Sequence, residues 1–274
     1  DKNCDANGML KSLAITLALL GAPSSITAAP SDGDLVVEGR KREALQEFVQ
    51  ALTDADRTRQ LARWNRAICP SIVGVDEGQA ALIEQNIARV AESLGLQAYP
   101  QGCPTTMLIV FDNEAQAIGA ALAKNQTVFL GQQGRDRLTD FAETKNPVRW
   151  ISLSDPCGFG GCALTGSRLS KSERPAINMM LVLVDGQEIG AFGLNEISDY
   201  LSMVVLGNPV LGEAWPNTSI LSMFSRERED QPFLLTDNDR AYLTGLYTSR
   251  TDATGPIQRR SIVEKMTNSG EQSE

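Results

Sequence analysis

Residues 195–207, NEISDYLSMVVLG, constrain the fold more than any other part of this chain. They follow an apolar run at residues 179–184 that is typical of a buried strand, and Asp185 and Gly186 form a turn between the two. Apolar side chains are expected on most sides of the helix that the segment predicts, which ends at a Gly-Asn-Pro sequence. A strand that leads into such a helix belongs at the centre of a domain.

The chain contains no histidine. This excludes Ser/His/Asp and Cys/His nucleophilic catalysis, histidine general bases and the common zinc sites. Any chemistry must use carboxylates, lysine, tyrosine, serine or cysteine. The formal charge is −9 and the basic residues are scattered, so a nucleic-acid partner is not expected, because phosphate contacts need clustered Lys and Arg.

Residues 9–29, MLKSLAITLALLGAPSSITAA, predict a secretory signal peptide, with a lysine, a short apolar core and small residues at the end. Residues 1–8 are expected to lie upstream of the natural start. The apolar core is shorter than the roughly 20 residues of a membrane-spanning helix, so a bare membrane anchor is the less favoured alternative. The mature protein is then periplasmic or secreted, without a stable membrane span.

Cys4 precedes the predicted signal, and the other cysteines follow it into a compartment where thiols oxidise. Spacing favours a disulfide between Cys157 and Cys162, which enclose GFGG, and another between Cys69 and Cys103, each of which is followed by proline. The sequence does not fix this connectivity. A zinc cluster of the same four residues is a weaker alternative, because paired C-x2-C spacing is missing.

Patterns of apolar residues and turn residues predict one α+β domain at residues 34–250, with a first part at 34–130 and a second at 145–250. Strands are expected at residues 34–38, 105–111, 147–153 and 176–184, helices at 41–52, 76–94 and 114–124, and a loop at 131–134. Residues 251–274 are polar and rich in turn residues, which predicts a flexible tail.

Residues 235–247, LTDNDRAYLTGLY, predict a further helix. The Thr236 hydroxyl is placed to cap its start, and Asp239 occupies the third helical position, as in a capping box. A turn with the sequence NTSILSMF precedes this helix at residues 217–224.

The order of these parts resembles the zincin-like metallopeptidases, matrixin-type enzymes in particular. Those have a strand, a helix with HExxHxxGxxH, a turn resembling SIM and a last helix reading like LTxxDxxxLxxLY. The corresponding parts here are NMMLVLV, ISDYLSMVVLG, SILSMF and residues 235–247, so the resemblance spans residues 178–247. The chain is also similar to exported proteobacterial proteins that keep this framework without zinc. The resemblance implies a zincin-like α+β fold with a mixed sheet, a central buried helix and a C-terminal helix.

Carried over position by position, the motif places its first histidine at Asp199, its catalytic glutamate at Tyr200 and its second histidine at Met203. A shift by one residue gives Tyr200, Leu201 and Val204 instead. Neither set supplies the metal ligands and the carboxylate base that a zinc peptidase needs. The peptidase activity of the family is therefore not implied for this chain, and no cofactor is expected.

Two hypotheses for the function remain. The favoured one is an exported non-catalytic domain that binds a protein, a peptide or a cell-envelope component through the cleft left by a lost active site. The alternative is a hydrolase that uses carboxylates or an unusual metal site without histidine. Glu196 and Asp199, three residues apart on one helical face, are the candidate carboxylate pair. Acids in a first helical turn also complement the helix dipole, which is the simpler explanation.

Overall fold

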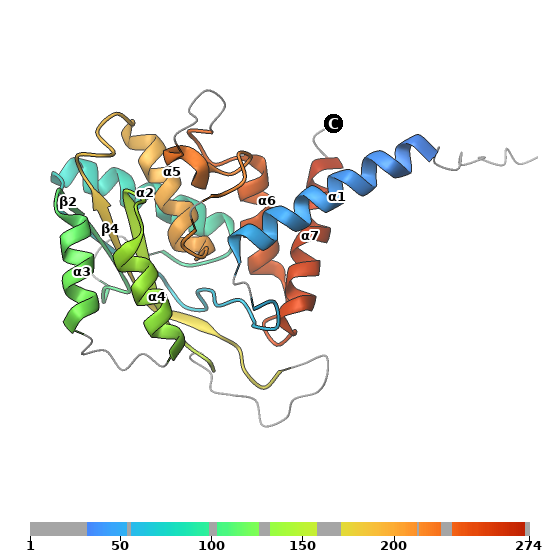
Figure 1. Ribbon diagram of the computed structural model, residues 1–274, viewed down its shortest axis with the longest axis horizontal. Coiled ribbons are helices and arrows are strands. Elements are labelled where there is room, and N and C mark those ends of the chain that lie inside the picture. Colours follow the sequence, from blue (N-terminus) through green and yellow to red (C-terminus); the bar gives the residue numbers. More distant parts are fainter. Residues whose placement is uncertain are drawn as a thin grey trace, which may run out of the picture.

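The computed structural model describes residues 32–53, 56–98, 103–125, 132–157, 171–212, 214–225 and 232–271. Within these ranges the chain is α+β, with a small mixed sheet and seven α-helices (Figure 1). The elements are α1 (Asp32–Leu52), β1 (Pro70–Val73), α2 (Glu77–Ser93), β2 (Met107–Asp112), α3 (Ala115–Asn125), α4 (Gln132–Glu143), β3 (Val148–Asp155), β4 (Ala176–Asp185), α5 (Leu194–Gly207), the 3-10 turn η2 (Ile220–Phe224), α6 (Asp237–Thr248) and α7 (Gly255–Glu271).

The sheet has the strand order β1-β2-β4-β3. β1, β2 and β4 are parallel, with Met107 of β2 opposite Pro70 of β1 and Met180 of β4. β3 is antiparallel to β4 and forms one edge. Strands of a parallel sheet that is covered on both faces are apolar throughout, and this explains the uninterrupted apolar run of β4. The three parallel strands end on the same side of the sheet.

Helices cover both faces of the sheet. Val182 and Val184 of β4 belong to the larger hydrophobic core, which includes side chains of α2 and α5. Leu183 points to the opposite face, where it packs with Phe141 of α4 and Ala115 of α3. Each residue of α5 from Ile197 onward is buried. The prediction of a mixed sheet with a central buried helix is therefore confirmed at the level of an α+β arrangement.

The predicted flexible tail is wrong for residues 255–271, which form helix α7. Ile262, Val263 and Met266 are buried in the main core, and α7 lies along both α6 and α1 (Figure 1). The close packing at its first residue explains why a glycine is needed there. A Cβ atom at Gly255 would lie 2.0 Å from the Arg59 carbonyl oxygen. Residues 272–274 lie outside the described ranges.

Two other local predictions were wrong. Residues 34–38 are helical, because α1 runs without interruption from Asp32. The loop predicted at 131–134 is replaced from Gln132 onward by α4, an amphipathic helix that buries Phe141 against the sheet. The predicted helices at 76–94 and 235–247 are confirmed, each with a capping box at its start. The strands expected near 105–111, 147–153 and 176–184 are also confirmed.

A disulfide joins Cys69 to Cys103, with the two Cα atoms 5.9 Å apart, as the spacing predicted. It ties the start of β1 to the loop before β2 and is compatible with an extracellular location. Cys157 is also disulfide-bonded. Its expected partner Cys162 lies outside the described residues, as do Cys4, residues 1–8 and the signal at 9–29. None of the described helices has the length and hydropathy needed to cross a membrane.

Candidate functional site

Tyr200, which the resemblance aligns with the catalytic glutamate of the zincin-like motif, is fully buried. The Tyr200 ring packs edge-to-face on Phe224, with ring centroids 4.7 Å apart. Its hydroxyl oxygen lies 3.5 Å from the side-chain amide nitrogen of Asn146. Burial raises the pKa of the Tyr200 phenol above its usual range, and the Asn146 contact opposes this only in part. The phenol is therefore neutral at ordinary pH and is a poor base and metal ligand.

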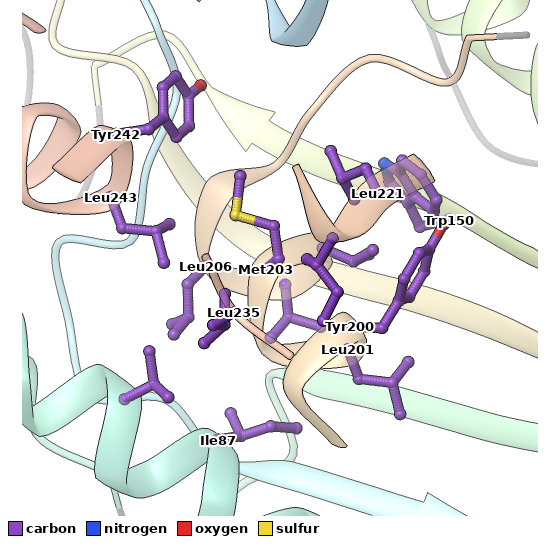
Figure 2. Close-up of a cluster of buried hydrophobic side chains, with 14 of the residues drawn as sticks. Ile87, Trp150, Tyr200, Leu201, Met203, Leu206, Leu221, Leu235, Tyr242 and Leu243 are labelled. Carbon is purple, nitrogen blue, oxygen red and sulfur yellow. The ribbon is translucent and has the colours of Figure 1, made fainter. Parts of the chain in front are cut away.

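Met203, which the resemblance aligns with the second histidine of the zincin-like motif, is part of the hydrophobic core. Met203 is fully buried among apolar side chains of α5, α6 and η2 (Figure 2). Met203, Leu243 and Tyr242 converge on Gly207, each with an atom within 3.5 Å of the point where a Cβ would stand. A thioether packed among apolar side chains in this way fills space.

Asp199, which the resemblance aligns with the first histidine of the zincin-like motif, has a structural role. One carboxylate oxygen accepts a hydrogen bond from the Asn86 side-chain amide of α2 at 2.7 Å, and the other accepts one from the backbone N–H of Leu235 at 3.0 Å. The exposed Arg89 guanidinium lies 3.8 Å from the first oxygen. Asp199 thus fastens α5 both to α2 and to the segment that leads into α6.

The candidate carboxylate pair is divided between different partners. Glu196 is occupied with helix capping, because one of its oxygens accepts a hydrogen bond from the Gly193 N–H at 2.8 Å. Asp199 is buried and uses both of its oxygens as described above. The alternative alignment also supplies no metal ligands, because Leu201 and Val204 are apolar and fully buried. Across the described ranges no three His, Cys, Asp or Glu side chains are grouped closely enough to hold a metal ion.

The turn η2 is held against α6 by a second buried carboxylate. Asp239 accepts hydrogen bonds from the Ser219 hydroxyl at 2.6 Å, from the Ile220 N–H at 2.9 Å and from the Thr236 N–H at 3.0 Å. Burial raises the pKa of Asp239, although these hydrogen bonds lower it. The contacts place Leu221 of η2 on the side of α5 that also carries Tyr200 (Figure 2).

A cavity of about 810 Å³ lies beside Tyr200, and we call it the Trp215 cavity. It is bounded by the end of α4 and the loop before β3, by η2, and by the residues Leu211, Gly212, Ala214, Trp215 and Asn217. Asn146, which bonds to the Tyr200 hydroxyl, and Phe224, which packs on the Tyr200 ring, both line the cavity. The apolar wall residues are Leu211, Ala214, Trp215, Leu221 and Phe224, and charged ones include Asp140, Glu143 and Lys145.

The Trp215 side chain lines this cavity, and its indole nitrogen is buried. Its ring stacks on Trp150 of β3, with centroids 6.0 Å apart and planes at 30°. The indole N–H of Trp150 donates to the Pro209 carbonyl at 2.8 Å. Among the described residues, the indole nitrogen of Trp215 finds no hydrogen-bond partner. An unpaired buried donor of this kind costs about 1–3 kcal/mol, which an acceptor on a ligand would recover.

The edge of β3 next to the cavity also has unpaired backbone groups. The Asp185 N–H donates to the Pro147 carbonyl at 2.8 Å. In an antiparallel ladder, pairs that exchange hydrogen bonds alternate with pairs that do not. Given the register of β3, Trp150 and Ser152 therefore direct their backbone groups away from β4. Within the described part of the chain, no hydrogen bond reaches these outward groups.

Comparisons with protein-family models, with curated proteins and with solved structures found no match. Neither Asn146 nor Trp215 was predicted from the sequence to be a site residue. Only one feature of the sequence points to Trp215, a large aromatic residue in the otherwise turn-rich segment LGEAWPN.

Proposed function

We propose that this chain is an exported, non-catalytic domain with a zincin-like arrangement of parts, which binds an extended segment of another protein in the Trp215 cavity. The chain order of β4, α5, η2 and α6 supports the resemblance, because it is the order of the corresponding parts in the zincin-like enzymes. The three positions that would carry the motif are occupied by Asp199, Tyr200 and Met203. Two of them belong to the core and one to the hydrogen bonds that hold α5, which supports a binding role over catalysis.

The unpaired indole donor of Trp215 carries this proposal. A peptide offers a carbonyl acceptor at every residue, and an extended peptide can add hydrogen bonds to a strand edge. The outward backbone groups of the buried residues Trp150 and Ser152 lie on the neighbouring strand. The volume of about 810 Å³ is within the range of ligand sites. The apolar part of the wall, chiefly Leu211, Leu221 and Phe224, is suited to an apolar side chain of the ligand.

The alternative of a hydrolase has less support. A carboxylate pair needs two acids that share a substrate proton or a water molecule. Glu196 caps its own helix, whereas Asp199 is buried and bonded through both oxygens.

Selection of a phage-displayed library of random linear peptides against the mature protein tests the proposal. Isothermal titration calorimetry of the selected peptides then compares the wild type with two variants. Trp215→Phe keeps the stacked ring and removes the donor, so binding should weaken by about fivefold, which corresponds to about 1 kcal/mol. Ala214→Trp places a large ring on an exposed part of the cavity wall and should abolish binding.

Ala121→Trp provides the matched control, because Ala121 is equally exposed but lies on α3. It should bind the selected peptides as the wild type does. Failure to select any peptide, or peptides that bind Ala214→Trp as tightly as the wild type, would overturn the proposed function.

A further inference from the structure

A second cavity, of about 770 Å³, lies beyond the carboxyl ends of the three parallel strands. Gly74 follows β1, Asn113 follows β2 and Gly186 follows β4, and all three line it. Gly74 has a φ of +88°, and a Cβ there would lie 1.9 Å from the Phe111 carbonyl oxygen, so glycine allows the ends of β1 and β2 to approach closely. In open α/β sheets, ligands bind in this position.

Apolar side chains from the start of α5 and the preceding turn form one wall of this cavity. They are Ile189, Phe192, Leu194 and Ile197. The Phe192 ring contacts Phe233, with centroids 6.3 Å apart. Phe233 is 42% exposed and the adjacent Leu234 is 54% exposed, so the apolar wall continues onto the surface.

The opposite wall is formed by α2, which contributes Gln79 to the cavity. Leu82, one turn further along the same helical face, is 52% exposed. The next residue on this face is Asn86. Its side-chain amide and the backbone N–H of Leu235 both donate hydrogen bonds to the Asp199 carboxylate. Asp199 thus joins the segments that carry Leu82 and Leu234. We call the cavity, together with the exposed side chains Leu82, Phe233 and Leu234 on the neighbouring segments, the strand-end groove.

The charged residues of the strand-end groove are acidic. Asp112 and Glu114 line the cavity, and both are exposed. Glu77 and Glu188, also exposed, are within two residues of the lining residues Gln79 and Ile189 along the chain. Attraction to Asp185 and Glu188 raises the pKa of the buried Arg149, so Glu188 is partly offset by a positive charge. Glu77, Asp112 and Glu114 are exposed acids at or beside the cavity. Among its described lining residues the cavity has no Lys or Arg.

We infer that the strand-end groove docks a basic segment of another protein that carries large apolar side chains. The exposed leucines and Phe233 supply contacts for apolar anchors, and burial of such anchors dominates the energetics of peptide recognition. The acidic rim attracts Lys and Arg on the same segment and repels acidic segments and anionic lipid surfaces. This groove is separate from the Trp215 cavity, since the two share no lining residue.

Fluorescence anisotropy with a short fluorescein-labelled peptide of alternating leucine and lysine tests the inference on the full mature chain. A peptide of alternating leucine and glutamate is the charge control. We expect saturable binding of the first peptide only, weakened severalfold when salt is raised from low to physiological concentration. Leu82→Ser and Leu234→Ser should each weaken binding by about fivefold or more, and Glu114→Lys by a similar factor.

Two variants control for nonspecific loss of surface leucine and of negative charge. Leu122→Ser removes a leucine that is 42% exposed on α3, and Glu92→Lys reverses an exposed charge at the far end of α2. Neither should change the affinity by more than about twofold, since surface substitutions away from a site have small effects. The inference is overturned if both peptides bind equally, if vesicles with anionic lipid bind in preference to the peptide, or if Leu122→Ser weakens binding as much as Leu234→Ser. Ala214→Trp should leave this binding intact, so the result is independent of the proposed function.

Discussion

Replacing Arg149 by methionine should stabilise this protein. Arg149 lies on β3 and is only 2% exposed. Within the described part of the chain, two of its buried nitrogens, Nε and one terminal nitrogen, have no hydrogen-bond partner. The aliphatic part of the Arg149 side chain lies next to Gly119 of α3 and near Phe141 of α4, which belongs to the smaller hydrophobic cluster. Burial lowers the pKa of the guanidinium, whereas attraction to Asp185 and Glu188 raises it. The charged group thus occupies an apolar layer that a methionine side chain fits.

The expected magnitude follows from opposing contributions. Each buried donor without a partner costs about 1–3 kcal/mol, so the two together destabilise the wild type by about 2–6 kcal/mol. The attraction to the two carboxylates offsets part of this, and the shorter methionine leaves a small void. Arg149→Met should therefore raise the free energy of unfolding by about 1–2 kcal/mol, in line with other replacements of buried charges. The Tm should rise by about 2–4 °C for each kcal/mol.

Urea unfolding monitored by circular dichroism, with a thermal scan as a second measurement, provides the assay. Arg260→Met removes the same charge from an exposed position on α7 and should change stability by less than about 0.5 kcal/mol. A loss of more than about 1 kcal/mol in Arg149→Met would refute the reasoning, because it would mean that the guanidinium is well solvated or paired in the folded protein.

Two further predictions concern stability. Asp199→Ala should lower the free energy of unfolding by about 2–4 kcal/mol in the same urea assay, because the buried N–H of Leu235 loses its acceptor, whereas the exposed Glu92→Ala should cost less than about 0.5 kcal/mol. Removal of the disulfide by the double substitution Cys69→Ala and Cys103→Ala should cost about 4 kcal/mol, the loop-closure value for a sequence separation of 34, and an unchanged urea midpoint would contradict this.

The parts of the fold that could be predicted carry their signals within a few neighbouring residues. Asp76 starts α2 with a capping box, and Thr236 starts α6 in the same way. The apolar run of β4 and the nearly uniform apolar character of α5 are equally local, and the structure buries both. The Cys69–Cys103 disulfide was predicted from the prolines that follow its cysteines and from the helix between them.

The parts that were missed depend on contacts between residues distant in sequence. α7 has few apolar residues, yet Ile262 and Met266 are buried because α1 and α6 lie against it. Likewise, α4 includes a glycine and many charges, and only its position on the sheet explains how it buries Phe141. The roles of Trp215 and Asp199 in the site could not be found for the same reason, since the partners of Asp199 are 113 and 36 residues away along the chain.

The packing of α7 against α1 has a consequence for the time at which the protein can fold. Arg259 of α7 donates hydrogen bonds to the Thr53 hydroxyl and to the carbonyl of Arg59, and Gln60 reaches the carbonyl of Ala253. Phe48 of α1 packs on Tyr242 of α6, and α1 lies along α7, so α1 obtains these neighbours only after α6 and α7 have been synthesised. Until then the apolar face of α1 remains uncovered, which delays cooperative folding.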